Sequence, residues 1–146
     1  MLIKGGIFME KELGEYFREI NTAVYNKLEE RLAKYELVKG QARLLLLIKD
    51  NDGCTQKELA NFVGVKYSSM SERLNKLERN GYIERVSDEE NMKYKRIFIT
   101  PEGKTAVVQC RKILKEIDEQ IFKGMTKKDK VQFETYLNKI IKNLSK

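Results

Sequence analysis

Apolar residues recur every three or four positions from residue 10 to about residue 35, with charged residues between them. This spacing places the apolar side chains on one face and predicts a first helix of about six to seven turns. Met9 is a possible alternative start, which would leave residues 1–8 as a loosely ordered extension. The apolar stripe comprises Leu13, Phe17, Ile20, Val24, Leu28, Leu32 and Tyr35.

A second and a third helix are predicted next. Residues 41–49 are apolar nearly all round and contain four consecutive leucines, which indicates a helix buried at the centre. Residues 50–53 are dense in turn formers and end it. Thr55 and Glu58 match the S/T-x-x-E capping box, in which each side chain bonds the other residue's backbone N–H, and so predict the next helix start. Gly64 permits the left-handed backbone angle that ends this helix and turns the chain.

A fourth helix follows the turn and is expected to begin at residue 66 or 68 and to end near residue 80. Its apolar residues lie at i, i+4 and i+7 and therefore share one face. The opposite face is polar. The apolar positions are Met70, Leu74 and Leu77.

Two strands and two more helices complete the chain. Residues 82–87 and 95–100 are short and rich in β-branched and aromatic residues, and a polar loop separates them, which predicts a β-hairpin. Thr100 can cap a further helix that reaches about residue 123, and residues 126–129 start the last one. The expected fold class is mainly α with a small β-hairpin wing: a winged helix-turn-helix with long N- and C-terminal helices.

A helix-turn-helix reads DNA because its second helix fits the major groove while the first braces it. The polar face of the fourth helix supplies hydroxyl, amide and cationic groups for base edges and phosphates. An ordinary helical hairpin with a solvated polar side is the alternative, and the hairpin directly after it favours DNA binding. The candidate DNA-binding residues are Ser68, Ser69, Glu72, Arg73, Asn75, Lys76, Arg79, Arg85, Lys93 and Lys95.

The tip of the predicted wing carries both signs of charge. Lys93 at the tip and Arg96 on the following strand can approach the DNA backbone or the minor groove, where the negative potential is enhanced. Asp88, Glu89 and Glu90 lie at the same tip and would be repelled by phosphate. We therefore expect the acidic side of the wing to face away from DNA.

The charge balance favours a polyanionic partner such as nucleic acid or an anionic membrane surface. The 146-residue chain has a formal net charge of +7 from 29 Lys and Arg against 22 Asp and Glu. Residues 101–146 hold eleven basic and six acidic side chains, so much of the excess lies outside the predicted reading helices. Either the last helices flank DNA or their lysines form a solvated surface, which is the commoner case.

Several classes of protein are excluded by what the chain lacks. Without histidine, and with only Cys54 and Cys110, it offers neither a disulfide framework nor a His-based metal site or triad. It has no paired carboxylates, phosphate-binding Gly-rich loop or nucleophile elbow, so we expect no enzyme activity and no cofactor. The longest apolar run, residues 44–48, is too short to span a bilayer. The sequence predicts a reduced, cytoplasmic protein with no membrane partner.

Residues 37–104 resemble the MarR family of winged-helix transcription regulators. The resemblance rests on the T-x-x-E-L-A start at residues 55–60, the L-x-x-x-G-x-I-x-R segment at residues 77–85 and the I-T-x-x-G exit at residues 99–103. The flanking helices also lie where that family keeps its dimerisation region. The resemblance implies a triangular homodimer in which the first and last helices interlock and two winged motifs straddle a palindromic operator. It also implies that an anionic or aromatic effector can bind between the dimerisation and DNA-binding parts.

The apolar stripes of the first, fifth and sixth helices agree with a dimer, because one small core does not obviously need all of them. Packing within a single chain is the alternative. The candidate dimerisation residues are Leu13, Phe17, Ile20, Ile117, Ile121, Phe133, Leu137, Ile140 and Leu144.

The chain departs from the family pattern inside its own reading surface. Asn91 and Lys93 stand where the family's wing carries Asp-x-Arg, so the usual carboxylate brace and the planar donors of Arg are both missing. Glu72 replaces a common basic residue, and Lys66 replaces the usual capping hydroxyl. The family's sequence specificity is therefore not transferable. The family's redox sensing uses a cysteine on the first helix, and neither cysteine of this chain lies there, so we interpret both as structural.

The sequence as a whole predicts one winged-helix domain over residues 1–146. Residues 54–100 are expected to bind DNA, and residues 10–35 and 101–146 are expected to form the dimer. The expected function is a homodimeric repressor that binds duplex DNA and is released by a small-molecule effector. The alternative is a winged-helix module that contacts another protein and binds no specific DNA.

Overall fold

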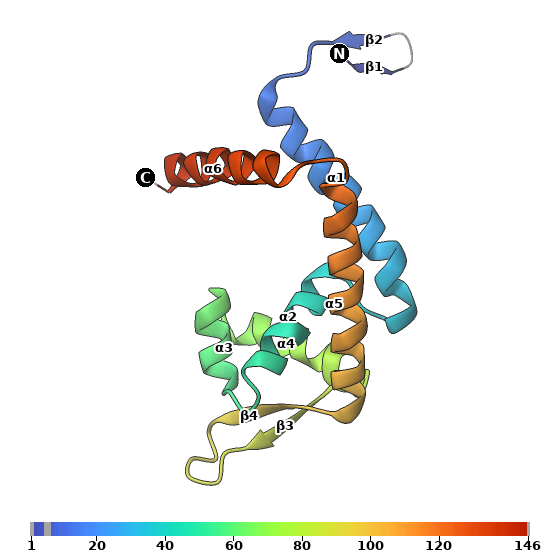
Figure 1. The fold of residues 1–146 in the computed structure, drawn as a ribbon. Coiled ribbons are helices and arrows are strands. Elements are labelled where there is room, and N and C mark those ends of the chain that lie inside the picture. The colour runs from blue at the N-terminus through green and yellow to red at the C-terminus, as the bar shows by residue number, and fades with distance from the viewer. Residues whose placement is uncertain (1, 5–6, 146) are drawn as a thin grey trace. The chain divides into compact units, whose positions relative to one another are not determined.

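The computed structural model describes residues 2–4 and 7–145, and the described chain is mainly helical with two short antiparallel strand pairs (Figure 1). The predicted fold class is confirmed: two helices are followed by a helix-turn-helix, a hairpin and two long helices. The elements are β1 (Leu2–Lys4), β2 (Ile7–Met9), α1 (Leu13–Leu32), the 3₁₀ turn η1 (Ala33–Tyr35), α2 (Lys39–Asp50), α3 (Gln56–Val63), α4 (Tyr67–Arg79), β3 (Ile83–Ser87), β4 (Lys95–Ile99), α5 (Pro101–Ile121) and α6 (Lys127–Leu144).

The start of the chain differs from the loosely ordered extension expected there. β1 pairs with β2 in antiparallel register, with Leu2 opposite Met9 and Lys4 opposite Ile7. The two triplets, one of them wholly apolar, flank a Gly-Gly dipeptide in the sequence, which is a hairpin signal.

The described chain divides into two compact units, residues 1–114 and residues 115–146. The first unit, here called the winged unit, contains both strand pairs, α1 to α4 and most of α5. The second contains the end of α5 and all of α6. Each unit is described by itself below.

The core of the winged unit is built from the apolar faces that the sequence predicts. The inward face of α4 is fully buried, and α2 contributes a buried leucine pair as its nearly all-apolar pattern requires. Burying such a side chain is worth about 1.5–3 kcal/mol, so this set dominates the stability of the unit. The fully buried apolar residues include Leu32, Leu45, Ile48, Met70, Leu74, Leu77, Ile83, Ile97 and Cys110.

The ends of α3 and α4 are set by local chemistry. The capping box is present: Glu58 N donates to Thr55 Oγ1 at 3.1 Å, and Thr55 N donates to Glu58 Oε2 at 3.2 Å. Gly64 follows α3 with φ +80°, the left-handed angle that favours glycine. Lys66 stands at the N-cap of α4, and in the described structure its side chain makes no capping bond. The departure at Lys66 therefore leaves the start of α4 without a hydroxyl cap.

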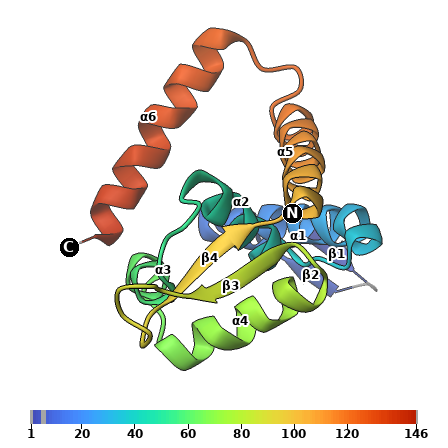
Figure 2. The ribbon, with the colours of Figure 1, turned by 90° about the horizontal axis from the view of Figure 1, so that it is seen from below.

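The two-stranded hairpin β3–β4 lies beside the helix-turn-helix (Figure 2), and an isolated bridge pairs Thr55, just before α3, with Arg96 of β4. β3 and β4 pair antiparallel with Ile83 opposite Ile99, and β3 packs on α4 while β4 packs on α2 and α3. The loop between α2 and α3 bonds the outer edge of β4: Gly53 N donates to Ile97 O at 2.8 Å, and Ile97 N donates to Cys54 O at 2.9 Å. The wing is thus held from both sides.

Thr100 and Gly103 lock the exit of the wing to the start of α5. The Thr100 hydroxyl donates to Gly81 O at 2.6 Å and accepts from Gly103 N at 3.0 Å, which confirms its predicted capping role. A Cβ added to Gly103 would lie 2.1 Å from Tyr82 O. The I-T-x-x-G exit therefore has a packing reason: only glycine allows α5 to start this close to the wing.

The second unit ends the chain with an open amphipathic helix. α6 starts in a capping box, with Asp129 N donating to Thr126 Oγ1 at 3.1 Å and Thr126 N donating to Asp129 Oδ2 at 2.9 Å. The rings of Phe122 and Phe133 lie 6.1 Å apart between centroids. Every residue of α6 is exposed or half-buried. In the part of the chain that the structure describes, no helix is long and apolar enough to cross a membrane.

Candidate nucleic-acid interface

The outer face of α4, opposite its buried Met70–Leu74–Leu77 face, is the predicted reading surface. Ser68, Glu72, Arg73, Lys76 and Arg79 are all exposed there, and Ser69 is half-buried at its edge. Three cations within two turns of this exposed face form a compact positive surface, whose charge Glu72 partly offsets. This surface has the width and chemistry to enter a groove, and its contacts with DNA stay a prediction.

Arg85 occupies a different setting from the cations of α4. It lies on β3 with its side chain 10 % exposed, against the inner edge of α4. Its Nε donates to Glu78 Oε2 and one terminal nitrogen donates to Glu78 Oε1, both at 3.1 Å. The same terminal nitrogen also donates to Asn75 Oδ1. The second terminal nitrogen donates to Gln56 Oε1 and Ser71 Oγ at 3.4 Å.

All five N–H groups of the Arg85 guanidinium are thereby directed to acceptors within this chain. The acceptors come from α3 and α4, so the guanidinium joins three elements at one point. The hydrogen bonds from Arg85 lower the pKa of the Glu78 carboxyl below its ordinary value. We name Arg85, Glu78, Asn75, Ser71 and Gln56 the Arg85 cluster.

Asn75 belongs both to the Arg85 cluster and to the predicted reading surface. It is exposed, and it lines a surface groove of α4 together with Glu72 and Arg79. Because Arg can only donate, the atom of Asn75 that faces Arg85 must be its oxygen, which turns the NH₂ group away from Arg85. The buried guanidinium therefore sets which edge of the Asn75 amide is presented outward.

The wing is braced differently from the family pattern that Asn91 and Lys93 replace. Arg96 Nε donates to Asp88 Oδ1 at 3.0 Å, and a terminal nitrogen of Arg96 donates to Gly53 O at 2.9 Å. Asn91 Oδ1 accepts from Lys93 N at 3.1 Å and so shapes the tip. Through these two bonds Arg96 holds the wing to the loop before α3, and its side chain stays 42 % exposed, so its predicted DNA contact stays a prediction.

The remaining wing cations are placed outward. Lys93 and Lys95 are exposed, as are Glu89 and Glu90 at the same tip. Asp88 is half-buried and paired, so only part of the acidic cluster is free to repel phosphate. Whether the acidic side faces away from DNA stays a prediction.

The predicted dimerisation residues fall into two groups by exposure. Ile117 is buried and Leu137 is half-buried in the single chain. The others lie open to solvent, with exposed fractions from 36 % to 84 %, which is unusual for large apolar side chains on one helix face. These exposed residues are Leu13, Phe17, Ile20, Ile121, Phe133, Ile140 and Leu144.

Both cysteines are poorly suited to sensing by oxidation. Burial raises the pKa of the Cys110 thiol, which lies fully buried on α5. Burial also raises the pKa of the half-buried Cys54 thiol, and the carboxylates of Glu58 and Asp52 raise it further. Both thiols therefore stay protonated at neutral pH, which disfavours the reactive thiolate.

Gln56 and Asp52 are structural residues of the interface that the sequence does not single out. Gln56 is buried, 1 % exposed, and its amide oxygen accepts from Arg85. Asp52 Oδ1 accepts from Ile99 N at 2.8 Å and so extends the bonding of the α2–α3 loop to β4. Each of these two hydrogen bonds joins residues that are about 30 to 47 positions apart in the chain. Local sequence patterns therefore do not reveal the structural roles of Gln56 and Asp52.

Comparison with known proteins gives one consistent result. The family model described as "MarR family" matches residues 37–95. The uncharacterized HTH-type transcriptional regulator YybA of Bacillus subtilis (strain 168) is 30 % identical over 111 residues, which are 76 % of this chain and 74 % of that protein. A putative MarR family transcriptional regulator from Clostridium acetobutylicum has a similar structure, with a TM-score of 0.68 and 32 % identity over 89 % of this chain and 96 % of that one. The S. aureus MepR–DNA complex has a TM-score of 0.80 at 23 % identity, covering 92 % and 99 % of the two chains.

Proposed function

We propose that this chain, which belongs to the MarR family of winged helix-turn-helix transcriptional regulators, works as a homodimer that represses transcription by binding a palindromic operator. The proposal rests on the difference in burial between the two faces of α4. One side is fully buried, and the other presents Arg73, Lys76 and Arg79 to solvent beside an ordered wing. A helix held this firmly, with its polar side free, is suited to a major groove.

The proposed reading surface is narrower than the sequence predicts. Arg73, Lys76 and Arg79 neutralise phosphates, and Ser68, Ser69, Glu72 and Asn75 contact base edges or phosphates. Lys93 and Lys95 reach the backbone or minor groove from the wing. Arg85 acts through the Arg85 cluster as a positioning residue, since its N–H groups are already directed to Glu78, Asn75, Ser71 and Gln56.

The proposed dimer is formed by the exposed apolar residues of α1, the end of α5 and α6. Large apolar side chains open to solvent on amphipathic helices are characteristic of interaction surfaces. Leu13 and Leu144 are 84 % and 80 % exposed, so a partner surface that covers them removes large apolar side chains from water. A two-fold dimer does this with the same residues on each subunit.

Repression in this proposal is steric. Two copies of α4 occupy successive major grooves about one helical turn apart and exclude polymerase. The assembled pair binds one operator, and an anionic or aromatic effector that binds better to a dimer with differently spaced reading helices lowers operator affinity. The similarity of this fold to that of MepR in the S. aureus MepR–DNA complex supports DNA as the partner.

Selection of bound fragments from random duplex DNA tests the proposal most directly. We expect a two-fold-symmetric consensus, and a binding constant that falls by about 10³ or more between about 50 and about 200 mM salt if six or more phosphates are contacted. The same measurement with single-stranded DNA of equal length is the control. Failure to bind duplex DNA at about 50 mM salt would reject DNA reading and favour the protein-interaction module.

The dimer is tested separately by sedimentation. We expect the protein to sediment as a dimer, and Leu13→Asp with Leu144→Asp to dissociate it, because a carboxylate in an apolar interface is strongly unfavourable. Glu12→Asp with Ser145→Asp adds or keeps acidic groups next to the same positions and should leave the dimer intact. A wild-type monomer at about 10 µM, well above the affinity of typical stable dimers, would overturn the assignment.

A further inference from the structure

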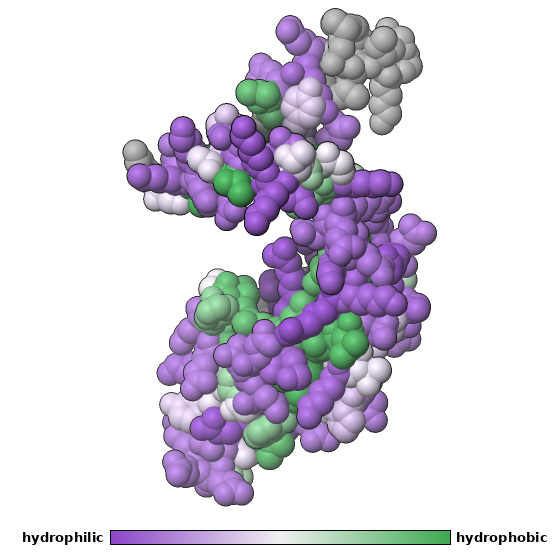
Figure 3. Space-filling model, in the orientation of Figure 1, coloured by the Kyte–Doolittle hydropathy of each residue, from purple (hydrophilic) through white to green (hydrophobic). Residues whose placement is uncertain are grey.

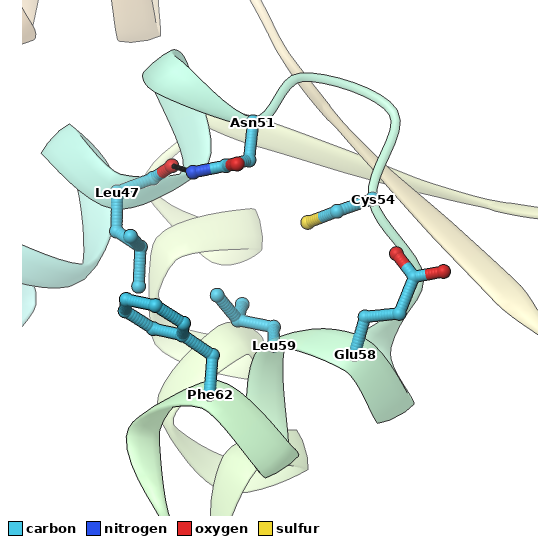
Figure 4. Close-up of a pocket in the computed structure, with 6 residues that line it drawn as sticks. All are labelled: Leu47, Asn51, Cys54, Glu58, Leu59 and Phe62. Carbon is cyan, nitrogen blue, oxygen red and sulfur yellow. Dashed lines mark hydrogen bonds between the residues drawn. The ribbon is translucent and has the colours of Figure 1, made fainter.

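A small pocket lies inside the winged unit, between α2 and α3, apart from the outer face of α4. Figure 4 shows its six lining side chains arranged around a common space, with the Glu58 carboxylate at the rim. Its volume is about 170 Å³. The lining residues are Leu47, Asn51, Cys54, Glu58, Leu59 and Phe62.

One wall of the pocket is apolar. Leu47 and Phe62 lie side by side in Figure 4, with Leu59 at the base. Leu59 is buried, whereas Phe62 is 77 % exposed at the C-terminal end of α3, where the surface in Figure 3 is apolar. A cavity of about 150 Å³ lined by such residues accommodates benzene, so the volume suits a single aromatic ring.

The other end of the pocket accepts hydrogen bonds. Asn51 Nδ2 donates to Leu47 O at 2.9 Å, which leaves the Asn51 amide oxygen available to accept and one N–H of the same amide available to donate. Glu58 Oε2 accepts from Thr55 N, and a carboxylate retains further lone pairs after one such bond. Cys54 Sγ points into the pocket between them. A ligand group that donates therefore finds two acceptors here, the Asn51 amide oxygen and the Glu58 carboxylate.

The charge of the polar end excludes anions. Glu58 is a carboxylate on the pocket wall, and Asp52 lies two residues before Cys54. These carboxylates and burial raise the pKa of the Cys54 thiol, which keeps it neutral. A second negative charge would meet the same penalty as the thiolate.

We propose that this pocket binds a neutral one-ring aromatic molecule that carries an O–H or N–H donor. The ring packs between Leu47, Leu59 and Phe62, and the donor bonds Asn51 Oδ1 or the Glu58 carboxylate. The site is distinct in place and in charge preference from the effector site between dimerisation and DNA-binding parts that the family resemblance implies.

The pocket is connected to the wing by backbone hydrogen bonds. Cys54, which lines the pocket, accepts through its carbonyl oxygen from Ile97 N of β4 at 2.9 Å. Asp52 in the same loop accepts from Ile99 N at 2.8 Å. A ligand that displaces this loop therefore also displaces β4, so ligand binding in the pocket changes the position of the wing.

Amide resonances of the ¹⁵N-labelled full-length protein test the proposal, with phenol as the probe and benzoate as its anionic counterpart. We expect phenol to shift the resonances of residues 47–62 in a saturable way, and those of Ile97 and Ile99 with them. We expect benzoate to bind at least about tenfold more weakly, because it brings a charge to the Glu58 end. The measurement needs no DNA, so its outcome is independent of the proposed operator binding.

Three variants make the result specific. Phe62→Ala removes an exposed wall residue and should weaken phenol binding about two- to tenfold, the range of an aromatic contact. Val63→Ala changes the neighbouring apolar residue outside the pocket and should leave phenol binding unchanged. Glu58→Gln keeps a capping-box residue and removes the charge, so benzoate should then bind about as well as phenol.

Two results would overturn the proposal. Phenol shifts that are absent from residues 47–62, or that Phe62→Ala and Val63→Ala weaken equally, would show that the pocket is not the site. Equal binding of phenol and benzoate to the wild-type protein would show that the polar end does not select neutral donors.

Discussion

The outer face of α4 and the Arg85 cluster beneath its edge present similar chemistry in opposite settings. Arg73, Lys76 and Arg79 stand exposed on α4, whereas Arg85 is 10 % exposed and donates to Glu78, Asn75, Ser71 and Gln56. The sequence predicts the same role for all four cations. We therefore expect a cation to contact DNA only where the fold leaves its donors exposed, and a cation whose donors are already bonded within the chain to position its neighbours.

The largest expected effect is on DNA binding by the outer face. Arg73→Ala combined with Lys76→Ala should lower duplex affinity about 10²- to 10³-fold and reduce the salt slope by about four, because the proposed dimer loses four phosphate contacts. The free energy of unfolding should change by no more than about 0.5 kcal/mol. Fluorescence anisotropy at several salt concentrations measures both quantities.

A charge-matched control separates this effect from net charge. Arg43→Ala with Lys112→Ala removes two exposed cations from α2 and α5 of the same unit. Its duplex affinity should fall by less than about tenfold, since these cations act only through screened long-range potential. Equal losses in the two double variants would remove the outer face from its assigned role.

The next effect is on folding, at the Arg85 cluster. Arg85→Ala should lower the free energy of unfolding by about 2–3 kcal/mol, because it leaves the buried Gln56 oxygen and its other acceptors without their donor. Because Glu78 is partly exposed, we expect this loss in the free energy of unfolding to be smaller than that for breaking a fully buried ion pair. Urea unfolding measures it, with Arg73→Ala as the exposed control.

Arg85→Lys distinguishes positioning from direct DNA contact. Lysine keeps the charge but not the planar five-donor fork, so we expect stability to stay about 1 kcal/mol or more below the wild type. A contact made to phosphate by charge alone would instead be rescued by lysine, with stability unaffected. That second pattern would return Arg85 to the reading surface.

Asn75 joins the two regions and sharpens the comparison further. Asn75→Asp keeps an acceptor for Arg85 and removes the outward NH₂ donors, so stability should change by less than about 0.5 kcal/mol while duplex affinity falls about tenfold or more. Asn75→Ala removes both functions and should reduce both. Equal affinity of wild type and Asn75→Asp would confine Asn75 to the Arg85 cluster.

The smallest effect is on the pH dependence of stability. Arg85 lowers the pKa of Glu78 below its ordinary value of 4.5, so the unfolded state binds the proton more readily. The stabilisation is therefore complete above about pH 4.5 and is lost as the pH falls through the lower pKa of the folded state. Glu78→Gln should flatten this part of the stability curve, because it removes the group whose pKa Arg85 lowers. Urea midpoints from about pH 6 to about pH 3 provide the measurement.

Local signals in the sequence predict most of the fold correctly. The Thr55–Glu58 capping box, the Gly64 turn and the apolar face of α4 all act within one or two turns of chain, and each is present in the structure. The N-terminal strand pair was missed because its triplets are too short to be distinguished from an extension. Element bounds shifted by only a few residues, as at α1, where the predicted start at residue 10 moved to Leu13.

The sequence by itself determined the order of helices, the wing and the family, because these depend on periodicity, caps and turn residues that are neighbours in the chain. Only the tertiary structure decided that Arg85 and Arg96 are engaged internally while Arg73, Lys76 and Arg79 stay free. Their acceptors, such as Gln56 for Arg85 and Gly53 for Arg96, lie about 30 to 43 residues away in the chain. Contacts between segments that are distant in the chain thus set which cationic donors are hydrogen-bonded. The pattern of charge along the sequence does not reveal these contacts.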